Sequence, residues 1–341
     1  MKPLDYIQQT LALAEQTLRS PSPNPYVACL IVREGKIVGT GIHQGAGSAH
    51  AEVLALQQAG SLAEGADVYV NLEPCCHFGR TPPCVNALIT AKVKRVFCAM
   101  VDPNPLVAGK GVQALRAAGI EVHVGFAETQ ARWLNRFFIH YIQQHTPYVI
   151  AKWAMSLDGQ MQTHAEDDRI ITNVESHRHA HHTRKEVDAI MIGVNTALAD
   201  NPALTVRYAD NPTNYQPLRI ILDSTGRLPV TTPPSKTLIV TTEGAAANWI
   251  KSMQAEHEIW VMTGVSIMLP EVLAKLGQRH VASLLVEGGR TLLTAFITQG
   301  LVQETHTYLG ANLIAGLTHK KSIAIVEQQV LQDNFFCRGV L

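Results

Sequence analysis

Apolar residues along the first 145 residues alternate between strand-like runs and helix-like spacing. Short runs rich in Val and Ile predict strands at 26–32, 36–42, 67–72, 95–101 and 121–125. Apolar positions three and four apart predict helices within 1–20 and at 51–60, 84–93, 111–120 and 127–145. Because strand and helix alternate, a mainly parallel or mixed sheet flanked by helices is the favoured architecture.

The same alternation restarts after the long helix, with Pro147 just beyond a boundary near residue 146. A second series of strand and helix patterns covers 146–159, 182–200, 218–224, 236–242, 257–264 and 283–289, with a helix from Arg290. The segment from 306 onward predicts mixed strand and loop. The chain is therefore expected to be an α/β protein of two domains, 1–145 and 146–341, each built on a mainly parallel or mixed sheet.

Composition narrows the class of protein. A chain of 341 residues with 46% apolar and 16% charged residues fits two folded domains. Lys plus Arg equals Asp plus Glu at 28 each, which argues against a broad nucleic-acid or anionic-membrane surface. No apolar run reaches the roughly 20 residues of a membrane span, and Gln and Glu interrupt the N-terminal apolar positions as no signal peptide would. We expect a cytoplasmic protein.

Three of the six cysteines lie within ten residues, a cluster that indicates metal binding or catalysis where disulfides are not expected. Cys75 and Cys84 follow a GSAHAEV segment that contains His50 and Glu52. One imidazole and two thiolates suit zinc, and three protein ligands leave a fourth position for water, as in catalytic sites. Prolines before Cys84 predict a helix that starts there, and a helix N-terminus favours a thiolate.

Glu52 would be the carboxylate that carries the proton of a zinc-activated water. Positions i and i+2 of a helix point about 200° apart, so His50 and Glu52 can share a pocket only if His50 lies at the helix start. Each residue alone has an ordinary alternative: a structural histidine, a core cysteine or a solvated glutamate. Together and in this order they predict a catalytic zinc site.

The pattern His-x-Glu followed by Pro-Cys…Cys resembles the cytidine deaminase superfamily. That superfamily usually has two residues between the cysteines, whereas Cys75 and Cys84 have eight between them. The longer HFGRTPP insertion, with SPNP and DPNPLVAGKG, resembles the deaminase half of the bifunctional RibD family of riboflavin biosynthesis. The resemblance implies that Glu52 shuttles protons while 2,5-diamino-6-(5-phosphoribosylamino)pyrimidin-4(3H)-one loses an amino group as ammonia.

By the same resemblance Cys76 packs away from zinc, and five residues contact the deaminase substrate: Asn24, His77, Arg80, Asp102 and Asn104. The Arg80 guanidinium suits the substrate phosphate, although a surface arginine is an equal alternative. The asparagines and Asp102 adjoin prolines and are also ordinary turn residues.

The second half lacks a G-x-G-x-x-G motif, but SLLVEGGR runs from a strand through two glycines into a helix, where a phosphate can approach the backbone. Alone, this is more often a tight turn. With KWAMSLDG and GVNTALADNPALTVR it resembles the reductase half of the same family, which implies a dihydrofolate-reductase-like fold and NADPH. The resemblance covers nearly the whole chain.

It implies a set of cofactor-facing residues: Ala154, Ile170, Thr196, Asp200, Gly289, Arg290, Thr291, Leu292, Leu293, Thr294 and Ala295. The substrate-facing residues would be Asp168, Arg184, Leu204, Arg207 and Glu287. The arginines suit the phosphate and Glu287 suits ring N–H groups. Lys152 would supply a proton or stabilise charge while hydride opens the ribose to ribityl; a structural lysine is the alternative. Asp168 and Ile170 stand where the family commonly has Ser and Trp.

The four histidines of HRHAHH suggest a second metal site, since His177 and His181 share a helix face. No third ligand is evident, and solvated helix surface is the preferred interpretation. Alternative functions are a nucleic-acid base deaminase with a C-terminal binding module, a non-catalytic nucleotide-binding protein, and a deaminase with a degenerate reductase half. We expect a small-molecule nucleotide substrate, no nucleic-acid or membrane partner, and a homo-oligomer, either dimer or tetramer.

Overall fold

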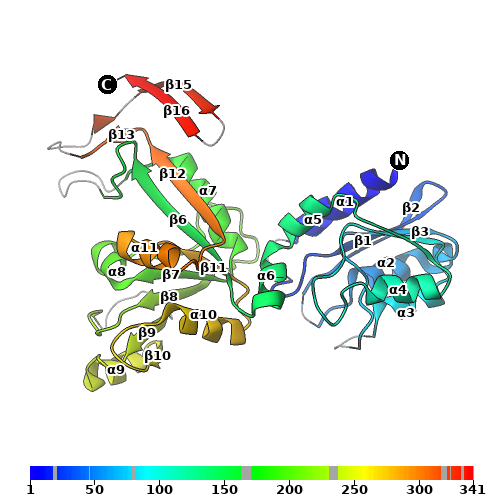
Figure 1. Cartoon of the computed structure of the whole chain (residues 1–341), viewed down its shortest axis with the longest axis horizontal. Coiled ribbons are helices and arrows are strands. Elements are labelled where there is room, and N and C mark those ends of the chain that lie inside the picture. Colours follow the sequence, from blue (N-terminus) through cyan, green and yellow to red (C-terminus); the bar gives the residue numbers. More distant parts are fainter. Residues whose placement is uncertain are drawn as a thin grey trace. The chain divides into compact units, whose positions relative to one another are not determined.

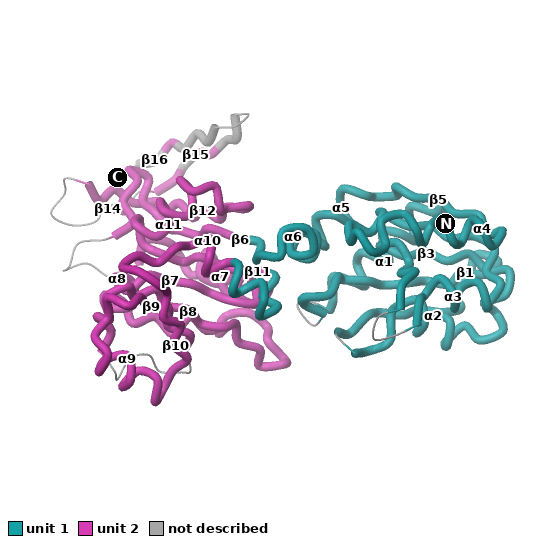
Figure 2. Tube along the Cα trace, turned by 60° about the horizontal axis from the view of Figure 1, so that its bottom comes forward, with its two compact units in different colours: residues 1–148, 274–282 teal, residues 149–273, 283–341 magenta. Residues whose placement is uncertain are grey.

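The computed structural model describes residues 1–17, 21–45, 47–78, 82–162, 170–229, 237–315, 321–322, 324–331 and 334–340. The chain forms two compact units (Figure 2). Unit 1 comprises Met1–Tyr148 and Ala274–Ala282, and unit 2 comprises Val149–Leu273 and Ser283–Leu341. Across these described ranges, no helix is both long enough and apolar enough to span a membrane.

Unit 1 alternates strands and helices as the sequence predicts (Figure 1). Its elements are α1 (Pro3–Glu15), β1 (Ala28–Arg33), β2 (Lys36–Ile42), α2 (Ala51–Ala59), the 3₁₀ turn η1 (Gly60–Ala63), β3 (Asp67–Val70), α3 (Cys84–Thr90), β4 (Arg95–Cys98), α4 (Lys110–Ala117), β5 (Glu121–Val124), α5 (Glu128–Leu134) and α6 (Arg136–Gln144).

The five strands form one mixed sheet in the order β2-β1-β3-β4-β5. β1 pairs antiparallel with β2 and β3, and β3, β4 and β5 pair in parallel. Helices α2, α3 and α4 lie in succession on one face, and α1 and α5 lie on the other (Figure 1). Because helices cover both faces of the sheet, β1 is buried almost throughout its length. Its sequence is correspondingly an almost continuous run of apolar residues.

Two glycines of β2 bring α2 close to the sheet. A Cβ at Gly41 would lie 1.9 Å from the Ala51 carbonyl oxygen, and one at Gly39 would lie 2.2 Å from that of Ala55. No side chain larger than hydrogen fits between these backbones. This close approach fixes the start of α2, and with it His50, against the sheet.

Unit 2 repeats the alternation around a second sheet. The remaining elements of the chain are β6 (Tyr148–Ser156), α7 (Val174–Glu186), β7 (Ala189–Gly193), α8 (Val194–Asp200), β8 (Leu218–Leu222), β9 (Leu238–Thr242), α9 (Ala247–Gln254), β10 (Glu258–Met262), α10 (Leu269–Gln278), β11 (Ser283–Val286), α11 (Arg290–Thr298), β12 (Glu304–Gly310), β13 (Asn312–Leu313), β14 (Lys321–Ser322), β15 (Ala324–Leu331) and β16 (Asn334–Val340). Of these, Tyr148 and the second half of α10, from Ala274, belong to unit 1.

Seven strands form this sheet in the order β10-β9-β8-β7-β11-β6-β12. The pairs from β10 through β11 are parallel, as is the β6–β12 pair. The two strands β15 and β16 form an antiparallel hairpin of their own, where the sequence predicted only mixed strand and loop. The expected α/β architecture, with one mainly parallel or mixed sheet in each half, is confirmed.

The long helix predicted over 127–145 is wrong in one respect: it is two helices, α5 and α6, with a break at Asn135. The fully buried Asn135 amide pairs with the backbone of Tyr26 just before β1. Its Oδ1 accepts from the Tyr26 N–H at 2.7 Å, and its Nδ2 donates to the Tyr26 carbonyl oxygen at 3.2 Å. This contact between residues 109 positions apart is tertiary, so helical periodicity could not reveal it.

Candidate active sites

Three side chains from separate elements of unit 1 converge on one point. His50 precedes α2 as its N-cap, Cys75 lies in the loop after β3, and Cys84 is the first residue of α3. The His50 Nδ1 lies 3.1 Å from the Cys84 Sγ and 3.4 Å from the Cys75 Sγ. All three atoms lie within 4.8 Å of one another. The predicted positions of His50 and Cys84 at helix starts are confirmed.

This donor set fits zinc. With Zn–S near 2.3 Å and Zn–N near 2.0–2.1 Å, tetrahedral ligand atoms stand roughly 3.5 Å apart. The nitrogen–sulfur distances of 3.1 and 3.4 Å need only a slight expansion to accept such an ion. Among the described residues this is the one such group of metal-binding side chains, and Cys76 is not part of it.

The two thiols are electrostatically unequal. The hydrogen bond from Cys84 and the nearby His50 lower the pKa of the Cys75 thiol to about 4, despite its burial. The Cys84 N–H also points at the Cys75 Sγ, at 3.3 Å. The same pairing, with burial, raises the pKa of Cys84. Since a metal ligand must lose its proton, one thiolate is preformed and cation binding must displace the second proton.

Glu52 occupies the first turn of α2 and is buried next to this cluster. Burial raises the pKa of its carboxyl to about 7, with a further contribution from the Cys75 thiolate. A carboxyl group in such surroundings exchanges protons easily near neutrality. The site thus combines a place for a Lewis acid with a proton carrier.

Two of the predicted substrate residues, Asn24 and Asp102, are linked to this cluster. The Asn24 Nδ2 lies 3.2 Å from the His43 Nε2, and the His43 ring in turn packs edge-on to the His50 ring. Asp102 is buried on the loop after β4, with its pKa raised to about 6 by burial. It accepts a 2.8 Å hydrogen bond from the Asn104 N–H. The His77 Nδ1 is buried and has no hydrogen-bond partner among the described residues. Arg80 lies outside them.

Glu73 is a buried residue that the sequence analysis did not assign. Its carboxylate accepts three backbone N–H bonds, two from the loop that carries Asp102 and one from the first turn of α4: from Asp102 at 3.1 Å, from Gly109 at 2.9 Å and from Val112 at 3.0 Å. A carboxylate satisfied by three amides fixes the loop. The only sequence signal was an acidic residue between apolar neighbours, directly before Pro74.

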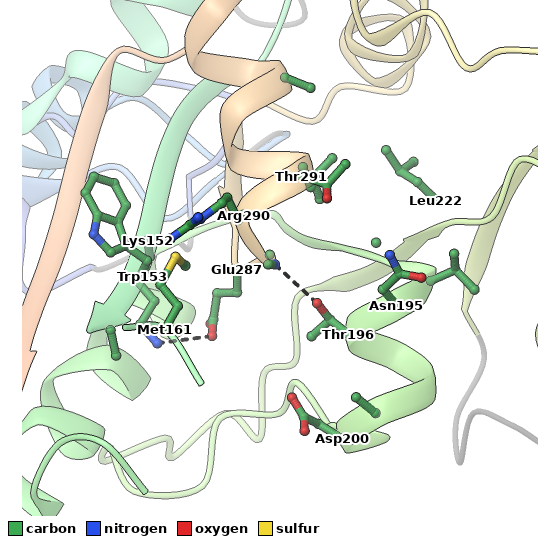
Figure 3. Close-up of a pocket in the computed structure, with 18 of the residues that line it drawn as sticks. Lys152, Trp153, Met161, Asn195, Thr196, Asp200, Leu222, Glu287, Arg290 and Thr291 are labelled. Atoms are coloured by element: carbon green, nitrogen blue, oxygen red, sulfur yellow. Dashed lines mark hydrogen bonds and ion pairs between the residues drawn. The ribbon is translucent and has the colours of Figure 1, made fainter. Parts of the chain in front are cut away.

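Unit 2 contains a cavity of about 1230 Å³. It opens beyond the carboxyl ends of β7, β8 and β11, where parallel α/β sheets generally bind ligands. The volume exceeds the roughly 300–1,000 Å³ of a typical single-ligand pocket. Figure 3 shows its wall, with Lys152 and Glu287 on one side and Asn195 and Thr196 on the other.

The predicted cofactor residues divide into two groups. Those that line the cavity are Ala154, Thr196, Asp200, Gly289, Arg290, Thr291, Leu292 and Ala295. Those that do not are Ile170, Leu293 and Thr294, and Leu293 is buried in the core. The Gly289 N–H donates to the Thr196 Oγ1 at 3.2 Å (Figure 3). Because Gly289 caps α11 without a side chain, the first amides of this helix can face an anion, which fits a phosphate-bearing dinucleotide.

Glu287 is the centre of a buried charge cluster. The Arg184 Nε and Nη2 donate to its two oxygens at 2.6 and 2.9 Å, and the Lys152 Nζ lies 3.6 Å away. Burial alone would raise the pKa of Glu287, but Arg184 and then Lys152 outweigh it and lower the pKa to about 2. Arg184, predicted to face the substrate, lies in the cavity wall with its guanidinium bound to Glu287.

Two other predicted substrate residues, Leu204 and Arg207, are not in the cavity wall. Leu204 is buried in the segment after α8, and Arg207 is exposed. Arg207 contacts the Tyr208 ring and has no carboxylate partner in the described part of the chain. It therefore remains available to an anion. Asp168 falls outside the described residues.

One interpretation of the histidine cluster is wrong. His181 is not on a solvated surface but buried, with its Nδ1 accepting from the Arg207 N–H at 3.0 Å. His177 and His182 are exposed, as expected. The burial comes from the segment after α8, which covers this part of α7. A helical spacing rule does not anticipate such a contact.

Comparisons with known proteins assign a family to each half of the chain. Residues 2–100 match the family described as "Cytidine and deoxycytidylate deaminase zinc-binding region", and residues 147–332 match "RibD C-terminal domain". The chain is 43% identical to "Riboflavin biosynthesis protein RibD" of Aquifex aeolicus, over 91% of this chain and 87% of that protein. It is 39% identical to the protein of the same name from Escherichia coli, over 91% and 88%.

Solved structures extend the likeness to the whole fold. RibD of Acinetobacter baumannii superposes with a TM-score of 0.81 at 35% identity, covering 99% of this chain and 98% of that one. A Thermotoga maritima protein described as a "diaminohydroxyphosphoribosylaminopyrimidine deaminase/ 5-amino-6-(5-phosphoribosylamino)uracil reductase" gives 0.79 at 28% identity, covering 98% and 97%.

Proposed function

The chain belongs to the RibD family of riboflavin biosynthesis, and from that premise we propose the substrates, the cofactor and the residue roles of its two reactions. It is an enzyme with a zinc-binding deaminase domain followed by a reductase domain. The alternative of a nucleic-acid base deaminase with a C-terminal binding module is set aside, because the C-terminal half matches the RibD reductase domain.

For the first reaction we propose hydrolytic deamination of 2,5-diamino-6-(5-phosphoribosylamino)pyrimidin-4(3H)-one. His50, Cys75 and Cys84 hold the zinc ion, which when bound acts as a Lewis acid that makes a water nucleophilic. The buried Glu52 carboxylate takes a proton from the attacking water and passes it to the ring nitrogen. It then delivers the second water proton to the departing amino group, so that ammonia leaves and a carbonyl remains.

Residues around Glu52 orient the ring. The unpartnered His77 Nδ1 and the buried Asp102 supply hydrogen bonds to the substrate, and Asn24, held by His43, adds a third contact. Asn104 completes the loop that Glu73 fixes. Arg80 is proposed as a partner of the substrate phosphate on chemical grounds, since guanidinium binds phosphate oxygens in pairs.

For the second reaction we propose NADPH-dependent reduction of 5-amino-6-(5-phosphoribosylamino)uracil. Bound NADPH would provide the hydride that the ribose C1′ gains as the bond from C1′ to the ring oxygen breaks and that oxygen takes a proton. Lys152, at the cavity wall and paired with Glu287, is the proton source. The α11 amides and Thr196 bind cofactor phosphate, and Arg207 takes the substrate phosphate.

We propose further that the enzyme works in the cytoplasm as a homo-oligomer, a dimer or a tetramer, on freely diffusing nucleotides. Sedimentation equilibrium gives the number of chains directly. A monomer at micromolar concentration would contradict this part of the proposal.

The main support for the proposed function is the cluster of three metal-ligand atoms, all within 4.8 Å of one another, beside the buried Glu52. The test is incubation of the purified chain with the diaminopyrimidine phosphate and NADPH, following ammonia and the absorbance of NADPH together. The proposal predicts one ammonia released and one NADPH consumed per substrate. Ammonia release without NADPH oxidation would remove the second reaction, and no ammonia would remove the first.

A further inference from the structure

The segment from Asn201 to Arg207, which follows α8, has a strained backbone. Leu204 adopts a left-handed conformation with φ 52°, and Asn201 does so with φ 37°. The Leu204 side chain is also buried, at 4% exposure. A non-glycine residue in this region costs of the order of 1 kcal/mol or more and persists only where its surroundings fix it. The segment must therefore be held by contacts from outside itself.

Those contacts come from side chains that bind its backbone. The Arg219 Nη1 donates to the Ala203 carbonyl oxygen at 3.2 Å, and the Arg184 Nη1 donates to that of Thr205 at 3.2 Å. Gln216 binds both polar groups of the Val206 backbone, at 2.8 and 3.3 Å. These hydrogen bonds hold the backbone of residues 203 to 206. Arg207, the last residue of the segment, needs a separate contact.

His181 makes that last contact. It lies on α7, three residues before Arg184, and its Nδ1 accepts from the Arg207 N–H at 3.0 Å. The ring is 4% exposed and packs edge-on to Tyr208 with centroids 4.8 Å apart. The Nε2 lies 3.3 Å from the Arg184 Nη1. Because Nδ1 accepts from Arg207, the one proton of the neutral ring is on Nε2, which lies next to the Arg184 guanidinium without accepting from it. A second proton, on Nδ1, would face the Arg207 N–H and have no acceptor.

The charges around His181 also favour the neutral form of its ring. Burial, followed by the positive charges of Arg184 and Arg207, lowers its pKa to about 4. Glu287 opposes this and the neighbouring His177 adds to it, both more weakly. The imidazole is neutral near pH 7, which is the form whose Nδ1 can accept a hydrogen bond.

The guanidinium groups of Arg184 and Arg207 differ in the partners that they bind. Arg184 uses its Nε, Nη1 and Nη2 on Glu287 and Thr205. Arg207 is exposed, and its guanidinium meets only the face of Tyr208 among the contacts of the described residues. Only Arg207 can offer a paired donor face to a phosphate without breaking bonds inside the protein. The direction of its side chain depends on where its backbone is held.

We propose that His181 is a positioning residue of the reductase site, whose Nδ1 fixes the Arg207 backbone so that the Arg207 guanidinium meets the phosphate of the ribosyl substrate. This rests on the proposed reductase function. His181 also lines the cavity, but the proposed role is exerted through the Arg207 backbone and not on the reacting atoms. It acts on substrate affinity, since a phosphate held equally in ground state and transition state changes KM and leaves kcat unchanged.

The test compares side chains that place an acceptor differently. Asn puts its Oδ1 near the position of the His Nδ1, whereas Gln reaches the position of Nε2 and leaves the Arg207 N–H unpaired. His181→Gln is expected to raise KM for 5-amino-6-(5-phosphoribosylamino)uracil about 5- to 10-fold, the effect of one lost hydrogen bond, with kcat within about twofold. His181→Asn is expected to keep KM within about twofold. His182→Gln, on the exposed neighbour, is the matched control.

A second measurement does not depend on turnover. Calorimetric titration with ribose 5-phosphate, in the absence of cofactor, should show weaker binding to His181→Gln by the same factor, and wild-type-like binding to His181→Asn. Equal KM values and equal ribose 5-phosphate affinities for the Gln and Asn variants would overturn the proposal, as would a fall in kcat at constant KM. Failure of the wild-type chain to bind ribose 5-phosphate would also overturn it. Binding without any reduction would instead remove the proposed reductase reaction.

Discussion

Replacing Glu287 by glutamine removes the negative charge at the centre of the reductase cluster. The side chains of Arg184 and Glu287 are only 12% and 9% exposed, so water screens their attraction little. The pKa of Glu287 falls from its ordinary 4.5 to about 2, and at 1.36 kcal/mol per pH unit this corresponds to about 3 kcal/mol of stability at pH 7. The measured cost of breaking buried ion pairs, about 3–5 kcal/mol, has the same size.

The pH dependence has a definite sign. Since the pKa of Glu287 is lower in the folded protein, its contribution is complete above the unfolded value near 4.5 and is lost as the pH falls toward about 2. The difference in unfolding free energy between wild type and Glu287→Gln should therefore be about 3 kcal/mol at pH 7 and shrink below pH 4.5. Groups common to both proteins, including the metal ligands of unit 1, cancel in this difference.

Urea unfolding followed by tryptophan fluorescence suits this measurement, because Trp153, Trp249 and Trp260 all lie in unit 2. The exposed Glu271→Gln is the control, with an expected change within about 0.5 kcal/mol. A loss below about 1 kcal/mol for Glu287→Gln at pH 7, or a difference that stays constant down to pH 3, would refute the argument that this carboxylate is stabilised by a buried ion pair.

Three further changes test other parts of the structure. Glu52→Gln should keep zinc but slow ammonia release about 10²- to 10⁴-fold, with reduction of pre-deaminated substrate unchanged; normal ammonia release in a coupled assay would exclude the proton-carrier role. Gly111→Ala places a Cβ 2.2 Å from the Pro74 carbonyl oxygen, so deamination should fall while NADPH oxidation with pre-deaminated substrate persists. A variant with normal deamination would show that the loop yields freely. Asn135→Ala leaves the Tyr26 N–H unpaired and should lower the unfolding free energy of unit 1 by about 1–3 kcal/mol in a calorimetric scan; an unchanged midpoint would contradict the role of this buried amide.

Local pattern was sufficient for the parts of the fold that local forces decide. Strand and helix periodicity predicted two α/β halves, and prolines before Cys84 predicted the helix start that places its sulfur near His50. The i, i+2 argument for His50 and Glu52 required His50 at a helix start, where the structure has it.

Hydrophobic periodicity and local motifs could not predict contacts between segments that are far apart in the sequence. The amide of Asn135 divides one predicted helix into two because it binds Tyr26, 109 residues earlier. Arg184 and Glu287, 103 residues apart, both line the cavity as residues assigned to the substrate, and they also bind each other, a pairing that no local pattern predicts. His181 has the sequence context of a surface residue and is buried by a segment that packs over α7.

Metal content tests the central claim most directly, that His50, Cys75 and Cys84 bind one zinc ion and that Cys76 does not. Elemental analysis of the purified chain should give about one zinc per wild-type chain and per Cys76→Ser chain, and well below half in Cys84→Ser. Full zinc in Cys84→Ser, or its loss in Cys76→Ser, would contradict the assignment of the site.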